Sequence, residues 1–195
     1  MAAPNIPLGG GSGILVLKGG NSASACTLTT IGRTSTGRLI GITAGHCGKP
    51  GQKVYSESFQ DRGQAGTITY STPDLDIAVI EFDQNRVIPV RSVRGVTINS
   101  VDTRPIGFPT IACKTGRTTG STCGVAWFSD GDAHLSQLCV VEGDSGSPVV
   151  VGDRLVAMVN AYYFLACVGP ETGTNIGPIL ARVNSLPNYK GFHVI

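Results

Sequence analysis

The chain has 195 residues, a length typical of one all-β unit, and only 14% of them are charged, against about 25% in an average soluble domain. Lysine and arginine exceed the acidic residues by only 15 to 13, so overall charge does not predict nucleic-acid binding. With 41% apolar residues and no apolar run of about 18 residues, the sequence predicts a folded core and argues against both disorder and a membrane span.

The chain begins Met1-Ala2-Ala3-Pro4, which is typical of an initiator methionine on a processed start, and no charged and apolar signal peptide is present. The run Gly9-Gly10-Gly11-Ser12-Gly13 predicts a flexible lead-in to the first strand. It lacks the Gly-Lys-Ser/Thr ending of a phosphate-binding loop, so we expect no nucleotide site there.

Short apolar or alternating segments then recur between glycine, proline, asparagine and aspartate residues, which predicts β-strands at 14–17, 39–42, 67–70, 77–82 and 124–128. Residues 148–151 and 155–159 predict a hairpin across a turn that contains Gly152. Helical spacing occurs in the tail, where Ile179, Val183 and Leu186 precede Pro187. Because crossover helices are lacking, the pattern favours antiparallel barrels or a sandwich with one terminal helix. Residues 91–104 are the best linker candidate between two strand-rich halves.

The chain contains six cysteines, an even number: Cys26, Cys47, Cys113, Cys123, Cys139 and Cys167. Their spacing matches no zinc motif, and spacing alone does not give their pairing. Three disulfides in an exported protein are favoured. The alternative is a cytosolic protein with reduced thiols, in which Cys47 and Cys139 are small core residues.

Three short segments contain residues that suit catalysis. His46 follows an apolar strand, Asp76 leads into the strand 77–80, and Ser145 stands in a turn with Gly143 and Gly146. A serine hydroxyl needs a base to accept its proton, and the imidazole needs a partner that fixes its tautomer and stabilises its cation. The glycines allow a sharp turn that points the N–H groups of Gly143 and Ser145 at one spot, as an oxyanion hole requires.

Each of these segments alone is ambiguous, since a lone histidine after a strand is more often structural and aspartate–glycine turns are usually only turns. Their order is more specific. It is His, Asp, Ser along the chain, whereas the G-x-S-x-G elbow of the α/β-hydrolases has the order Ser, acid, His. Asp76 is preferred to Asp74 as the acid because Asp74 lies in a turn beside Pro73. His134 and His193 have no partner motif, and we expect both to be ordinary surface residues.

Three motifs carry a family resemblance: T-A-G-H-C at 43–47, G-D-S-G-S-P at 143–148 and C-K-T-G-R-T-T-G-S-T-C-G at 113–124. With them the sequence resembles the bacterial serine proteases of the chymotrypsin fold, closest in pattern to the streptogrisin and α-lytic protease group. Ser147 replaces the glycine of most members. The resemblance implies an all-β chain of two packed six-stranded antiparallel barrels with a C-terminal helix, and pairs Cys26–Cys47, Cys113–Cys123 and Cys139–Cys167.

The resemblance also implies two domains, each of which carries part of the catalytic triad. Residues 1–95 would form the N-terminal barrel, which carries His46 and Asp76. Residues 96–195 would form the C-terminal barrel, which carries Ser145 and the specificity pocket. In streptogrisins an arginine after the third cysteine pairs with the aspartate before the serine, and Lys114 stands at that position.

We therefore expect a pair of Asp144 and Lys114 to support the oxyanion loop. Lysine is a point charge without the bidentate fork of arginine, so it would hold the loop less firmly. On this view Lys114→Ala reduces activity with little loss of fold. The alternative is that Lys114 is a solvated surface residue.

The pocket for the side chain before the scissile bond is expected from Val140, Val141 and Glu142 on one wall and Asn160, Ala161, Tyr162 and Tyr163 on the other. Relatives have Ser-Gly-Gly on the second wall, so the aromatic run that ends at Phe164 is expected to narrow or cover the pocket. We expect no aspartate at the base of this pocket, so the pocket should not select an arginine or lysine side chain. A preference for small or apolar residues and a partly closed site both remain open, as does an aromatic run that packs between the barrels.

The sequence thus predicts a secreted or cell-envelope serine endopeptidase that uses His46, Asp76 and Ser145 through an acyl-enzyme. We expect a protein or peptide substrate, a monomer, no metal or organic cofactor, no nucleic acid and no membrane span. The alternative is a protease-shaped binding or regulatory protein whose site is occluded, weakly active or inactive.

Overall fold

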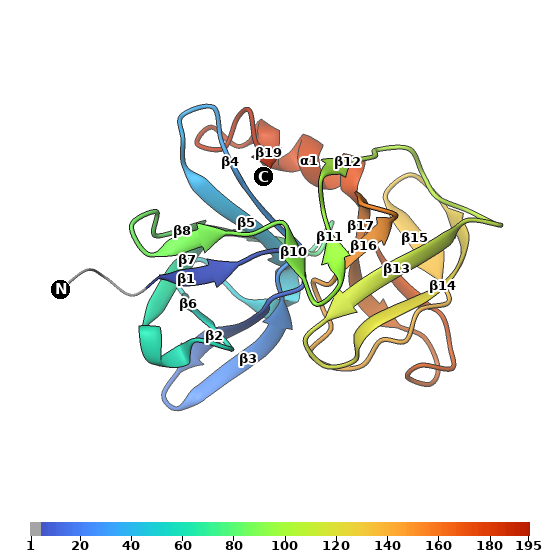
Figure 1. Cartoon of the computed structure of the whole chain (residues 1–195), viewed down its shortest axis with the longest axis horizontal. Helices are drawn as coiled ribbons and strands as arrows, with labels where there is room; N and C mark the ends of the chain where they lie inside the picture. Colours follow the sequence, from blue (N-terminus) through green and yellow to red (C-terminus); the bar gives the residue numbers. More distant parts are fainter. Residues whose placement is uncertain (1–4) are drawn as a thin grey trace.

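The structure, a computed structural model, describes residues 5–195, so the expected processed start at Met1–Pro4 lies outside the described residues. Strands form two bodies that lie side by side, and one helix covers one end of the molecule (Figure 1). The strands predicted from apolar and alternating segments are all present, and the mostly β chain confirms the expected fold class.

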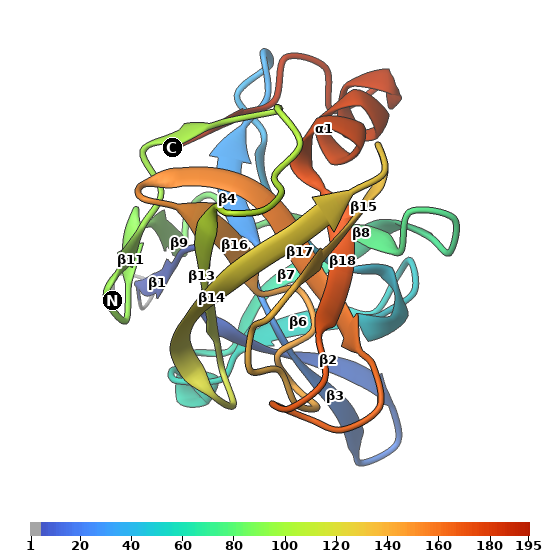
Figure 2. The same ribbon diagram turned by 90° about the vertical axis from the view of Figure 1, so that its right-hand side faces the viewer.

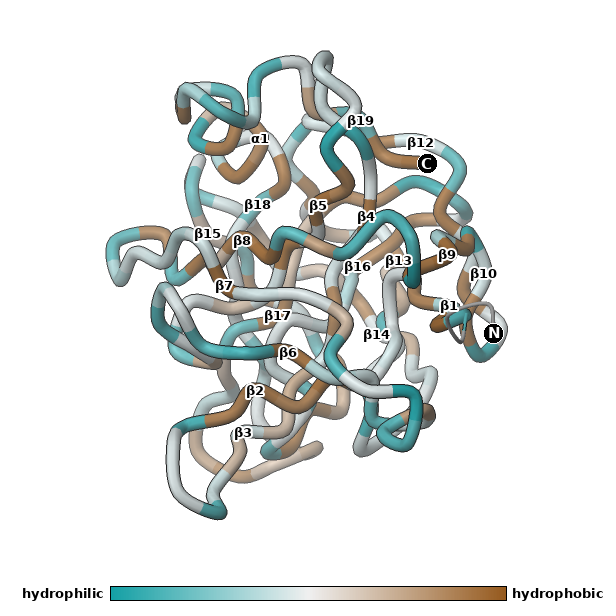
Figure 3. The backbone as a smooth tube through the Cα atoms, turned by 90° about the vertical axis from the view of Figure 1, so that its left-hand side faces the viewer, coloured by the Kyte–Doolittle hydropathy of each residue, from teal (hydrophilic) through white to brown (hydrophobic). Residues whose placement is uncertain are grey.

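An eight-stranded antiparallel sheet builds the first body, in the order β19-β4-β5-β8-β7-β6-β2-β3. Its strands are β2 (Gly13–Gly19), β3 (Ser22–Thr27), β4 (Thr30–Arg33), β5 (Leu39–Ala44), β6 (Lys53–Ser56), β7 (Gln64–Thr72), β8 (Ile77–Phe82) and β19 (His193–Val194). Hydrophobic residues lie along β2, β5 and β8, whereas many of the connecting turns are hydrophilic (Figure 3). β5 is buried along its whole length and leads into the segment that contains His46.

A seven-stranded sheet builds the second body, in the order β12-β17-β16-β13-β14-β15-β18. Figure 2 shows β13 to β18 of this sheet. The strands are β12 (Ser100–Val101), β13 (Ile111–Gly116), β14 (Gly120–Ser129), β15 (Ala133–Ser136), β16 (Pro148–Val151), β17 (Arg154–Tyr162) and β18 (Glu171–Asn175). A further pairing of β17 with β18 closes six of them into a barrel. The predicted hairpin is β16–β17, whose turn has Gly152 at φ 65°.

Short elements join the two bodies. β1 (Ile6–Leu8) pairs in parallel with β9 (Val87–Pro89), and β10 (Ser92–Val93) pairs with β11 (Val96–Thr97). The predicted boundary between residues 95 and 96 falls in the turn between β10 and β11, and it stays a prediction. Helix α1 (Ile176–Ser185) confirms the expected tail helix, with Ile179 and Val183 buried.

The glycine run before the first long strand differs from expectation. Gly9, Gly10 and Gly11 are buried, so the prediction of a flexible lead-in is wrong. Gly11 donates to the carbonyl of Leu28 over 2.7 Å, and a Cβ on Gly10 would come within 2.5 Å of the Thr29 carbonyl oxygen. These glycines permit close backbone packing, which a composition-based interpretation as a linker does not detect.

Candidate active site

His46 stands where β5 ends. A single 3-10 turn, η1 (Gly45–Cys47), follows the buried strand and brings the histidine side chain to the surface. The N–H of Gly45 donates to the carbonyl of Asp76 over 2.8 Å. A Cβ on Gly45 would lie 2.7 Å from the Thr72 carbonyl oxygen, so this turn requires glycine. The turn therefore ties the histidine segment to the start of β8.

The imidazole of His46 connects Asp76 to Ser145. Its Nδ1 lies 2.8 Å from Oδ2 of Asp76, and its Nε2 lies 2.9 Å from Oγ of Ser145. The backbone N–H of His46 also donates to Oδ1 of Asp76 over 2.8 Å. The structure thus brings together the three residues that were predicted from separate motifs, in a row that suits proton transfer from the serine.

Asp76 has a left-handed backbone conformation, with φ 50°, which aspartate tolerates better than most residues. The side-chain amide of Asn160 donates to the Asp76 carbonyl over 3.0 Å and to Oδ2 over 2.6 Å. Burial raises the pKa of the Asp76 carboxyl, but hydrogen bonds and charge from His46, with the Asn160 amide, outweigh it and lower the pKa. Asp76 is therefore held as a carboxylate that faces the imidazole.

Ser145 lies in a sharp loop between two glycines with positive φ, Gly143 at 95° and Gly146 at 88°. A Cβ on Gly146 would lie 2.1 Å from the Thr27 carbonyl oxygen, so the loop passes very close to the first barrel. Within residues 5–195, the N–H groups of Gly143 and Ser145 have no hydrogen-bond partner, whereas that of Gly146 donates to a backbone carbonyl. Two free N–H groups beside the serine are what an oxyanion hole requires.

Two threonines of the first barrel hold this loop of the second. Thr27 donates its N–H to the carbonyl of Ser145 over 2.8 Å and its hydroxyl to that of Gly143 over 3.0 Å. The hydroxyl of Thr29 donates to the carbonyl of Gly146 over 2.6 Å. Neither residue was predicted, because a threonine at the end of a strand or in a short connection has no local signal that reveals a partner so far along the chain.

Asp144, next to the serine, is fully buried. Its Oδ1 accepts the N–H groups of Thr118 and Thr119 at 3.0 and 3.1 Å, and its Oδ2 accepts the Thr119 hydroxyl at 2.6 Å and the Val141 N–H at 3.1 Å. Three of these four donors come from Thr118 and Thr119 in the loop after β13, so the T-G-R-T-T segment supports the serine loop directly.

Lys114 is also fully buried, so the alternative of a solvated surface lysine is wrong. Its ammonium donates to the Gly120 carbonyl over 2.8 Å and to the Thr119 hydroxyl, and it lies 3.9 Å from Oδ2 of Asp144. Burial lowers the pKa of Lys114, while the charges of Asp144 and Glu171 act against this shift. Thr119 thus stands between the two charges of the predicted pair.

Three disulfides brace the surroundings of the site, Cys26–Cys47, Cys113–Cys123 and Cys139–Cys167. These are the pairs that the family resemblance implies. The first joins β3 to the turn that carries His46, and the third ties the segment before Ser145 to the loop after β17.

The strand expected to form the second pocket wall runs beside the serine, since the Asn160 carbonyl lies 3.4 Å from Oγ of Ser145. The Asn160 side chain faces Asp76, and its Oδ1 accepts the hydroxyl of Thr174 at 2.9 Å. On the first wall Val140 is buried, Val141 is half-buried and Glu142 is exposed. The role of these residues in binding substrate stays a prediction.

The aromatic run of the same strand is exposed. Tyr162 is 40% exposed, Tyr163 49% and Phe164 96%, so the alternative in which these rings pack between the barrels is wrong. Ala161 is exposed beside them. An apolar, solvent-facing surface therefore follows directly from the strand that passes Ser145.

Two other residues that the sequence singled out, His134 and Asp74, have partners outside the triad. His134 is buried, and its Nε2 lies 2.9 Å from Oε1 of the buried Glu171, so the prediction of a surface histidine is wrong. Strands β15 and β18 pair there, and the two residues come together only through that pairing. Asp74 pairs with Arg182 of α1 through both carboxylate oxygens, at 3.1 and 2.7 Å. The ion-pair partner of Asp74 is therefore on the helix, and Asp74 is not the acid beside His46.

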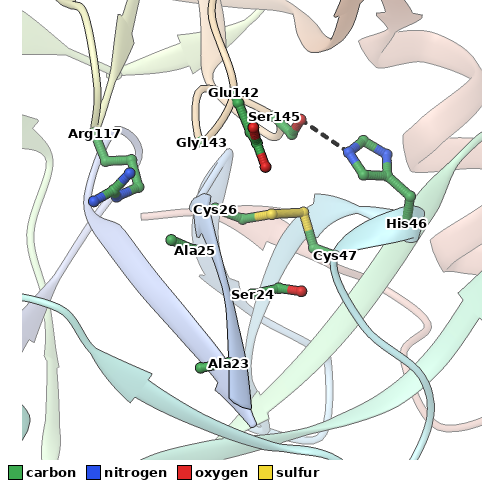
Figure 4. A pocket seen from close by; sticks show the side chains of 10 residues that line it. All are labelled: Ala23, Ser24, Ala25, Cys26, His46, Cys47, Arg117, Glu142, Gly143 and Ser145. Atoms are coloured by element: carbon green, nitrogen blue, oxygen red, sulfur yellow. Dashed lines mark hydrogen bonds between the residues drawn. A yellow bond between two sulfur atoms is a disulfide. The ribbon is translucent and has the colours of Figure 1, made fainter. Parts of the chain in front are cut away.

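A cavity of about 450 Å³ opens beside Ser145 and His46 (Figure 4). Its lining comes from β3, the first disulfide and the serine loop, with Arg117 at one side: Ala23, Ser24, Ala25, Cys26, His46, Cys47, Arg117, Glu142, Gly143 and Ser145. The cavity therefore borders both the histidine and the serine of the triad. Within residues 5–195, no helix is long and apolar enough to span a lipid bilayer.

Comparison with known proteins agrees with this fold. Serine protease 1 of Rarobacter faecitabidus is 30% identical over 155 residues, which are 70% of this chain and 28% of that protein. Solved structures of Nocardiopsis protease (NAPase) and Thermobifida fusca protease A each superpose with a TM-score of 0.74 at 22% identity, over 91% of this chain and 96% of theirs. The chain has the chymotrypsin fold.

Cellulomonas bogoriensis chymotrypsin, with a TM-score of 0.71 at 21% identity over 97% of this chain and 99% of that one, agrees. The chain is a homologue of bacterial serine proteases of the chymotrypsin fold. It spans less than a third of the length of the curated relative that it matches. No protein-family model matches it.

Proposed function

We propose that the chain is a serine endopeptidase. The row Asp76–His46–Ser145 carries this proposal, with its two contacts of 2.8 and 2.9 Å. Ser145 Oγ attacks the peptide carbonyl carbon while His46 Nε2 accepts the serine proton, and the carbonyl oxygen becomes the oxyanion. His46 then gives the proton to the nitrogen of the leaving amine, the C–N bond breaks, and an acyl-enzyme remains.

Water completes the cycle by the same path. His46 accepts a proton from the water that attacks the acyl carbon and returns it to Ser145 as the acid leaves. The Asp76 carboxylate orients the imidazole and stabilises its cation. The unpartnered N–H groups of Gly143 and Ser145 stabilise the oxyanion in both halves, an effect that is worth about 10²–10³ in rate per donor in related chemistry.

The residue before the scissile bond is proposed to be small or apolar. Val140 supplies an apolar wall, and the family resemblance aligns Tyr162 with a glycine of the relatives, which supports a small or apolar side chain there. The buried acid Glu171 is engaged by His134 and supports no selection of a basic residue there. A set of peptides that vary at this residue tests the preference, and strong cleavage after arginine contradicts it.

A fluorophosphonate probe provides the decisive test of catalysis. We expect the wild-type chain to be labelled on Ser145 and to cleave a peptide, and Ser145→Ala to do neither. The exposed rings of Tyr162, Tyr163 and Phe164 favour the second candidate, a protease-shaped binding protein with a closed site. Absence of labelling in the folded wild type supports that candidate and contradicts the endopeptidase.

We also propose that the protein works outside the cytoplasm as a monomer. The three disulfides support an oxidising compartment, because such bonds rarely persist in the cytosol. Cell fractionation tests the location, and sedimentation of the purified chain tests the monomer.

A further inference from the structure

The cavity beside Ser145 and the strand with the aromatic run flank the serine from different sides. The cavity is lined by residues 23–26 of β3, by the Cys26–Cys47 disulfide and by His46. Residues 160–164 do not line it. A peptide bound across the serine therefore has one half along β17 and the other half in the cavity.

The path of the proton during cleavage indicates which half of the substrate enters the cavity. The proton that His46 Nε2 takes from Ser145 must reach the nitrogen of the leaving amine. That amine begins the part of the substrate that follows the scissile bond, so this part must pass the serine on the imidazole side. Since His46 and its disulfide neighbour line the cavity, the cavity receives the residues that follow the scissile bond.

Two charged side chains line the cavity, and one of them is neutralised. Arg117 donates Nε to Oε2 of Glu57 over 2.8 Å, Nη2 to the other oxygen of Glu57, and Nη1 to the Thr118 hydroxyl over 3.0 Å. The carboxylate of Glu57 therefore balances the charge of this guanidinium. Lys18 binds the Cys47 carbonyl oxygen at 2.6 Å, and it is not among the lining residues.

Glu142 is the other charged side chain. It is exposed, and within residues 5–195 its carboxylate has no hydrogen-bond or ion-pair partner. In Figure 4 the side chain extends from the serine loop into the space above the disulfide. The cavity lining thus includes one unbalanced negative charge, that of Glu142, together with the methyl groups of Ala23 and Ala25.

We propose that Glu142 selects a lysine or arginine in the part of the substrate that follows the scissile bond. The ammonium or guanidinium would pair with the carboxylate, and the aliphatic stem would cover the alanines and the disulfide. This inference rests on the proposed endopeptidase activity, because it concerns the peptides that Ser145 cleaves. It adds a charge preference on the leaving-group side to the apolar preference on the acyl side.

Internally quenched peptides test the proposal. They share one sequence and differ in a single residue, lysine, glutamine or glutamate, at each of the two positions after the scissile bond. We expect wild-type kcat/KM to be about three- to tenfold higher with lysine than with glutamate at one of these positions, as a partly exposed ion pair allows. Because salt screens such a pair, the ratio should fall as ionic strength rises.

Variants assign the preference to one side chain. The lysine-to-glutamate ratio should fall toward one in Glu142→Gln and invert in Glu142→Lys. Asp132→Asn, which removes an equal charge from the exposed β14–β15 turn, should keep the wild-type ratio. Melting temperatures of all variants verify that they are folded.

Fluorophosphonate labelling separates the two ways in which the proposal can fail. An enzyme that is labelled and cleaves the peptides, but shows no charge preference or the same preference in Glu142→Gln, overturns this inference and leaves the endopeptidase intact. A folded wild type that is neither labelled nor active overturns the proposed function and this inference with it.

Discussion

Replacing Lys114 with methionine tests how the serine loop is supported. The lysine is fully buried, its ammonium donates to Gly120 and Thr119, and it lies 3.9 Å from Asp144. Methionine has a similar length and no charge, so the substitution keeps the packing and removes the cation. The alanine substitution would also leave a cavity, so it would mix the loss of the charge with a loss of packing.

The size of the effect follows from the charges. Two unit charges 3.9 Å apart attract by about 4 kcal/mol at an effective dielectric constant of about 20. Removing one partner of a buried pair typically costs about 3–5 kcal/mol, because the other charge stays buried. Asp144 retains four neutral donors, so we expect a loss near the lower limit, about 3 kcal/mol, or a fall in Tm of roughly 6–12 °C. The expectation of little loss of fold therefore does not apply to this buried position.

The pH dependence of stability provides a second measure. Burial lowers the pKa of Lys114 below its usual 10.5. Between the lowered value and 10.5 the unfolded chain binds more protons at this residue than the folded chain, so its contribution makes the unfolding free energy rise with pH. We expect the methionine variant to lack this contribution. Urea unfolding of both proteins, with disulfides intact, from neutral pH to 10.5 measures the difference.

Activity completes this test. The loop that Lys114 supports contains the N–H groups of Gly143 and Ser145, and we expect Lys114→Met to slow fluorophosphonate labelling about tenfold. Lys114→Arg retains the charge and serves as the matched control. A methionine variant that melts within about one degree of wild type and is labelled at the same rate would refute the reasoning.

Two further substitutions test positions that the structure identifies. Asn160→Ala removes both hydrogen bonds to Asp76, and we expect kcat to fall about tenfold with little change in KM. Asn160→Ser keeps a donor and should restore part of the rate. Equal activity of the wild type and both variants contradicts a positioning role. Gly146→Ala should abolish labelling or folding, because its Cβ would lie 2.1 Å from the Thr27 carbonyl oxygen. Gly152→Ala is its control, because Gly152 also has a positive φ but has open space where the Cβ would lie. This control should stay folded, with only a small decrease in Tm.

The candidate site residues that lie within short sequence motifs could be predicted from the sequence. His46, Asp76 and Ser145 each stand beside residues whose type reflects a local backbone need, such as the glycines that flank the serine. The predicted tail helix and the β16–β17 hairpin were likewise local patterns, of helical spacing and of a glycine turn. These features depend on neighbours in sequence, so a single chain is enough to detect them.

Features that depend on distant segments were not predictable. The burial of His134 follows from its contact with Glu171 on another strand, and Gly10 is buried because the backbone of Thr29 packs against it. Asn160 was assigned to the substrate pocket because of its position relative to Cys167, whereas its side chain faces Asp76. In each case the tertiary fold decides which way a side chain points.

The hydrogen bonds from Thr27 and Thr29 to the serine loop have a consequence for the order of folding and activation. They span the two barrels, as do the contacts of His46 with Ser145. A chain in which only one barrel has folded has the base without the nucleophile, or the nucleophile on a loop that lacks its outer support. Under the proposed mechanism, peptide cleavage therefore requires that both halves are folded and docked.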